Sequence, residues 1–82
     1  MIINLDNTSG LIQKRVQLGR NKYNLIIVFN HTDEYWYISI AGHIQGIRVT
    51  KNRTLFKTRD GQLKATGAID KENFKTLEWI NA

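Results

Sequence analysis

The chain of 82 residues contains no cysteine and no proline. Without cysteine it can form neither a disulfide nor a thiolate metal site, so its stability depends on an apolar core. Without proline, its loops are held by glycine, asparagine and aspartate, and we expect them to stay soft until a neighbour packs on them. A chain this small buries only about 60% of its unfolded surface. We therefore expect one domain, residues 1–82, that is marginally stable alone or supported by a partner.

Long apolar runs are also missing. A bilayer-spanning helix takes roughly 18–20 apolar residues, and no stretch comes close. The first residues lack the basic and then apolar pattern of a signal peptide. We therefore expect a chain with no membrane partner.

Acidic residues are scarce: seven Asp and Glu face twelve Lys and Arg, which gives a net charge of +5. Between Ala41 and Ala68 the only acid is Asp60, and the basic residues of this stretch form a candidate basic patch: Arg48, Lys51, Arg53, Lys57, Arg59 and Lys64. Such an excess could attract nucleic acid or an acidic protein face, or it could be a solvated surface that keeps a small domain soluble.

What the chain has in abundance is strand-like alternation. Tyr23, Leu25, Ile27 and Phe29 share one face of a strand. Trp36, Ile38 and Ile40 share one face of the next strand, after the polar loop His31-Thr32-Asp33. Period-two geometry predicts an antiparallel hairpin with this face on a core that includes Trp36. The fold class we predict is all-β, a small antiparallel β-barrel or sandwich of about six to eight short strands.

The remaining strands follow from shorter patterns. We expect a strand at Ile2–Leu5, then a turn at residues 6–10, and a strand at Leu11–Leu18. Lys14 interrupts the apolar face of Leu11–Leu18, and an inward lysine is typical of an edge strand. The next strand, Gln45–Lys51, should point Ile47 and Val49 inward. Strands at Thr54–Thr58 and Gln62–Thr66 flank Asp60-Gly61, a dipeptide suited to a type I′ turn with two positive φ angles.

Two segments allow alternatives. After a turn at Asp70–Asn73 we favour a last strand through Leu77–Ile80, although Ile69, Phe74, Leu77 and Ile80 also have near-helical spacing. The first strand could complete the chain's own fold or pair with an exposed sheet edge on a neighbour.

Two tyrosines also leave their role open. Tyr35 and Tyr37 point away from the Trp36 face and could meet solvent, a base or a partner subunit. The candidate interface residues are therefore Ile2, Ile3, Leu5, Tyr35 and Tyr37.

The chain shows no arrangement typical of catalysis. His31 with Asp33 is half a metal site at most, and the same pairing is common as a loop hydrogen bond, while His43 lies in a separate turn. Neither Ser9 nor Ser39 has a Gly-x-Ser-x-Gly context, and no glycine-rich phosphate loop is present. The carboxylates are scattered. We therefore predict that the protein is not an enzyme, with no catalytic residues, no cofactor and no metal.

In their order along the chain, these segments resemble a known family. They are Ile3-Asn4-Leu5-Asp6-Asn7, Gln17-Leu18, Tyr23-Asn24-Leu25-x-Ile27-x-Phe29-Asn30, Tyr35-Trp36-Tyr37-Ile38-Ser39-Ile40, Gly46-Ile47-Arg48-Val49, Gly61-x-Leu63 and Leu77-Glu78-Trp79. The series is similar to the small baseplate plug proteins of contractile-tailed phages, the family first defined in a cyanophage. The chain departs from that family after Val49, where relatives tend to have a Pro-Gly turn and this chain has Thr50-Lys51-Asn52-Arg53.

The resemblance implies a virion structural protein of the tail baseplate, near the hub and tube, made in the host cytoplasm. It would bind other tail proteins and copies of itself around the tail axis. The competing hypothesis is a small basic β-barrel that binds nucleic acid.

Overall fold

The structure, a computed structural model, describes residues 1–6 and 10–82. The turn predicted at residues 6–10 falls mostly on residues 7–9, which lie outside the described residues. Within the described ranges every regular element is a strand. The strands are β1 (Ile2–Asn4), β2 (Leu11–Leu18), β3 (Asn21–Asn30), β4 (Tyr35–Ile40), β5 (Ile44–Arg48), β6 (Thr54–Thr58), β7 (Gly61–Lys64) and β8 (Thr76–Asn81).

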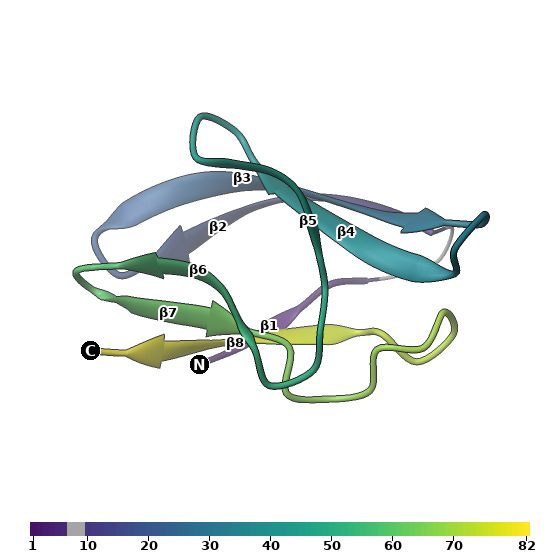
Figure 1. Cartoon of the computed structure of the whole chain (residues 1–82). Helices are drawn as coiled ribbons and strands as arrows, with labels where there is room; N and C mark the ends of the chain where they lie inside the picture. The colour runs from purple at the N-terminus through teal and green to yellow at the C-terminus, as the bar shows by residue number, and fades with distance from the viewer. Residues whose placement is uncertain (7–9) are drawn as a thin grey trace.

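The strands form two antiparallel sheets that face each other (Figure 1). Their orders are β2-β3-β4-β5 and β1-β8-β7-β6, with four strands each. The sheets do not close on each other, so the all-β prediction is confirmed in its sandwich form rather than as a barrel.

The β3–β4 hairpin brings the two predicted apolar faces together. Leu25 pairs with Ile40, Ile27 with Ile38 and Phe29 with Trp36. All of these side chains are buried, together with Tyr23. The alternation of β-branched and aromatic residues therefore predicted both the pairing and the buried face.

The expected edge position of Leu11–Leu18 is confirmed, since β2 is the outermost strand of its sheet. Lys14 pairs with Leu25, on the inward-facing side of the strand. Its ammonium donates a hydrogen bond to the Asn4 carbonyl oxygen and lies 3.6 Å from the Asp6 carboxylate. The inward lysine thus joins the edges of the two sheets while its charge stays partly solvated.

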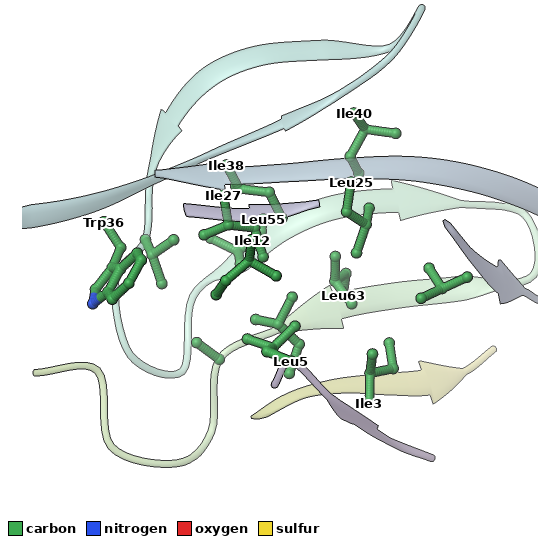
Figure 2. Close-up of a cluster of buried hydrophobic side chains, with 14 of the residues drawn as sticks. Ile3, Leu5, Ile12, Leu25, Ile27, Trp36, Ile38, Ile40, Leu55 and Leu63 are labelled. Carbon is green, nitrogen blue, oxygen red and sulfur yellow. The ribbon is translucent and has the colours of Figure 1, made fainter. Parts of the chain in front are cut away.

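The inner faces of the two sheets supply one core (Figure 2). Figure 2 shows side chains from both layers pointing toward each other, among them Ile27 and Ile38 from one sheet and Leu63 from the other. Trp36 is only 1% exposed, and its ring lies 5.2 Å from that of Phe29 and 5.0 Å from that of Phe74, between centroids. The predicted core position of Trp36 is confirmed.

The two ambiguous termini both join the second sheet. β8 pairs with β7 on one side and β1 on the other, so the C-terminal segment is the favoured strand and not the alternative helix. The turn before it is closed by the amides of Asn73 and Phe74, which both donate to the Asp70 carbonyl oxygen. β1 completes the chain's own sheet, the first of the two alternatives for this strand.

Two local predictions were wrong. Ile47 pairs opposite buried Ile38, but it is 41% exposed because β5 is an edge strand and β4 is its main packing partner. Val49, beyond the end of β5, is buried as expected.

The second wrong prediction concerns the β6–β7 turn. Thr58 pairs with Gly61, so the two connecting residues are Arg59 and Asp60 rather than Asp60 and Gly61, and Asp60 does not have a positive φ. The Asp60 carboxylate instead accepts hydrogen bonds from the Arg20 amide (3.0 Å) and the Arg20 side chain (3.1 Å), which ties this turn to the β2–β3 turn.

Candidate protein-interaction surface

The outer side of the β2-β3-β4-β5 sheet carries exposed apolar side chains. Strand register places Leu11 opposite Val28 and Val28 opposite Tyr37. Ile26 and Tyr35 lie on the same side, two residues along their strands from Val28 and Tyr37. Leu11 is 51% exposed, Val28 42% and Tyr35 44%. We call this surface the outer apolar face: Leu11, Ile26, Val28, Tyr35 and Tyr37.

The β3–β4 loop holds the two tyrosines in place. One carboxylate oxygen of Asp33 accepts a hydrogen bond from the Tyr35 backbone amide at 3.0 Å, and the other accepts a hydrogen bond from the Tyr37 hydroxyl. Glu34 adopts φ 62°, and its amide donates to the Asn30 carbonyl oxygen at 2.8 Å. The hydrogen bond to Asp33 raises the pKa of Tyr37 above its ordinary value, and partial desolvation acts in the same direction. The Tyr37 side chain and the Tyr35 backbone are therefore held by Asp33 before any partner arrives.

Arg48 joins the tyrosines from the next strand. It pairs with Tyr37 across β4 and β5, and its guanidinium carbon lies 4.6 Å from the centroid of the Tyr35 ring. That distance is typical of a cation–π contact. The sequence assigned Tyr35 and Tyr37 to a candidate interface and Arg48 to a basic patch, and the structure brings the three together.

A groove runs from this corner toward the other sheet. It has a volume of about 560 Å³, and its lining includes Tyr37, Ile47, Arg48, Thr50, Arg53 and Thr54. We call it the Arg48–Arg53 groove. The chain segment beside it crosses between the sheets (Figure 1). Two hydrogen bonds anchor this segment. The Val49 amide donates to the Trp36 carbonyl oxygen, and the Asn52 amide donates to the Ala65 carbonyl oxygen, each at 2.8 Å.

The candidate basic patch is divided. Lys57 and Lys64 pair with Gln62 and Thr54 on the outer side of the β1-β8-β7-β6 sheet, whereas Arg48 pairs with Tyr37 on the outer side of the other sheet. Lys51 and Arg53 lie on the crossover, and Arg59 lies in the β6–β7 turn at another corner. The six basic residues therefore do not form one continuous surface, and only Arg48 and Arg53 share the groove.

Ile3 and Leu5 are not available as interface residues. They are 5% and 2% exposed, because β1 pairs with β8 and turns these side chains into the core. Ile2, on the other side of the strand, is 57% exposed and lies near exposed Ile80 of β8. The assignment of Ile3 and Leu5 to an interface is thus corrected, while Ile2 stays on the surface.

The histidines lie apart. His31 is in the loop before β4, with its ring 5.2 Å from that of Phe29, and His43 follows β4, with its ring 5.1 Å from that of Tyr23. Across residues 1–6 and 10–82, no three His, Cys, Asp or Glu side chains gather as a metal site.

Leu11, Ile26 and Val28 were missed as surface residues by the sequence analysis. The signal was present in β3, where Leu25 to Phe29 is apolar at every position, so that both sides of the strand carry apolar side chains. A strand that is apolar on both sides is typical of a sheet whose two faces are both buried against other surfaces.

No family model, curated protein or solved structure matches this chain. None of the described residues belongs to a helix long and apolar enough to cross a membrane.

Proposed function

We propose that the chain is a non-enzymatic structural component of a phage tail baseplate, a plug between hub and tube, that acts through protein–protein contacts in a symmetric assembly. The observation that supports this proposal best is the outer apolar face. Contiguous exposed apolar surface rimmed by polar residues is typical of interaction sites. The preordered Tyr35, Tyr37 and Arg48 add residue types that are enriched at protein interfaces.

The resemblance in sequence supplies the assembly in which this surface would work. A small domain bound by neighbours gains stability from them by mass action, which suits an 82-residue chain without cysteine. In that assembly the outer apolar face would be covered by a hub or tube subunit or by another copy of the chain.

The alternative, a nucleic-acid-binding module, has less support. Such modules use a continuous basic track with exposed aromatic faces for stacking. Here Lys57 and Lys64 lie on the other sheet from Arg48, and Arg48 lies over one face of the Tyr35 ring.

The proposal is tested in the phage that carries the gene. An amber mutation should give tails without an intact baseplate, and Val28→Glu should restore neither baseplate nor infectivity although the isolated variant folds. The matched control is Gln62→Glu, which places the same charge on the outer side of the other sheet and should restore both. Normal, infectious tails without the protein would rule out the structural role.

A further inference from the structure

We propose that the Arg48–Arg53 groove binds an acidic, extended segment of a partner protein. This inference rests on the proposed function, since it names the kind of partner that one part of the same surface receives. It starts from the charges in the groove. Arg48 and Arg53 both line it, and neither pairs with a carboxylate within the described residues. Guanidinium groups bind carboxylates through two parallel hydrogen bonds, so two arginines in one groove favour an acidic ligand.

Both arginines are attached to well-anchored positions. Arg48 lies over the ring of Tyr35, whose backbone amide is bound by Asp33. Arg53 closes a turn through its amide and the Thr50 carbonyl oxygen at 3.3 Å, after Asn52 at φ 65°. Asparagine tolerates this left-handed conformation better than most residues. Because the groove is held in place before binding, less conformational entropy is lost when a ligand enters it.

The groove suits an extended protein segment. Among the described strands β5 has a neighbour on one side only, so a segment lying along the groove runs beside an open sheet edge. Exposed Ile47 also lines the groove and offers an apolar contact beside the two arginines. A segment that alternates acidic and apolar residues matches this pattern, since alternate side chains of an extended chain point the same way.

Nucleic acid fits the same groove less well. Arg48 lies over one face of the Tyr35 ring, so a base stacking on that face would have to displace the guanidinium. Beyond the groove the basic side chains do not continue along one surface, since Lys57 lies beside Gln62 on the outer side of the other sheet and Arg59 lies in the β6–β7 turn.

The test uses the purified whole chain and a short fluorescein-labelled peptide that alternates Glu and Val, measured by fluorescence anisotropy. We expect the double variant R48Q/R53Q to raise the Kd by about tenfold or more, as expected for lost charge-assisted hydrogen bonds. The control K57Q/R59Q removes the same charge from the end of β6 and the β6–β7 turn, whose residues do not line the groove, and should change the Kd by less than about twofold. A peptide with Gln in place of Glu should bind the unaltered chain at least about tenfold more weakly, a comparison that needs no variant to fold.

Three results would overturn the inference. The Glu-Val peptide could fail to bind at about 1 mM. The two double variants could weaken binding equally, which would show a response to net charge alone. An oligo-dT strand could bind more tightly than the peptide and lose that binding in R48Q/R53Q, which would assign the groove to nucleic acid. Because the assay needs no tail, its failure leaves the baseplate role to be decided by the amber mutant.

Discussion

Replacing Trp36 with alanine tests the arrangement of the whole sandwich. The indole is 1% exposed and contacts the rings of Phe29 in its own sheet and Phe74 in the segment leading to β8. A buried tryptophan removes about 200 Å² from water, worth about 5 kcal/mol at about 25 cal/mol per Å² as an upper value. Truncations of large core aromatics typically cost about 3–5 kcal/mol. We expect a loss of that size in the free energy of unfolding.

The expected cost of Trp36→Ala is a large part of the free energy of unfolding of the whole domain. A domain of this length has a stability of about 4–12 kcal/mol. For a chain of this size each kcal/mol lowers the Tm by about 4–8 °C, so the Tm should fall by at least about 12 °C. The measurement is urea denaturation followed by far-UV circular dichroism and by the fluorescence of the remaining Trp79, which is also buried.

The matched control is Tyr35→Ala, one residue earlier on the opposite side of β4. Its ring is 44% exposed, so the change should cost about 1 kcal/mol or less, including the loss of the Arg48 contact. If Trp36→Ala costs less than about 1 kcal/mol, or Tyr35→Ala costs more than Trp36→Ala, the inner and outer sides of the sheet have been assigned the wrong way round.

Two further changes test individual contacts. Gly61→Ala would place a Cβ 2.3 Å from the Ile80 carbonyl oxygen at φ 156°, so we expect a loss of about 2–4 kcal/mol in urea denaturation. Gly42→Ala at φ 81°, with open space around it, should cost only about 1 kcal/mol, and equal losses would contradict the close packing of β7 on β8. Hydrogen bonds from Arg20 lower the pKa of Asp60 below its ordinary 3.8, so this carboxylate stabilises the fold above that pH and the benefit is lost as pH falls through the lower folded-state pKa. Asp60→Asn should therefore flatten the fall in Tm between about pH 5 and pH 2, and parallel Tm profiles for the two proteins would refute the Arg20–Asp60 contact.

The sequence predicted the strands whose alternation is strong. In β3 and β4, four and three alternating apolar side chains determine the buried side of each strand. The edge position of β2 followed from one residue, Lys14, because a charged side chain on the inward side cannot lie in the middle of a sandwich.

The errors fall where tertiary contacts override local pattern. Asp60-Gly61 matches a common turn dipeptide, yet Asp60 is held by Arg20, forty residues away in sequence, and Gly61 is held against Ile80. Ile47 matches a buried position, yet burial depends on what the opposite sheet covers. Neither the Arg20 contact nor the limits of the opposite sheet can be read from the residues near these positions.

The candidate site has the same dependence on distant residues. Tyr35 and Tyr37 could be assigned to the outer side of β4 from alternation alone. Their proximity to Arg48 required the β4–β5 register, in which a bulge between Ile38 and Ile40 changes the count of residues. Without that bulge the pairing would shift by one residue, and Arg48 would exchange sides with Ile47.

The bulge therefore has a consequence for binding as well as for register. At the bulge the Gly46 amide donates to the Ser39 hydroxyl at 2.9 Å, and Gly46 adopts φ 61°. An irregular edge strand resists pairing with arbitrary strands, which protects an exposed sheet edge from aggregation. Affinity at this edge must then come from side chains, and Arg48 and Arg53 are the charged side chains in the groove beside it. A partner recognised in this way is selected by its charge pattern and not by backbone pairing alone.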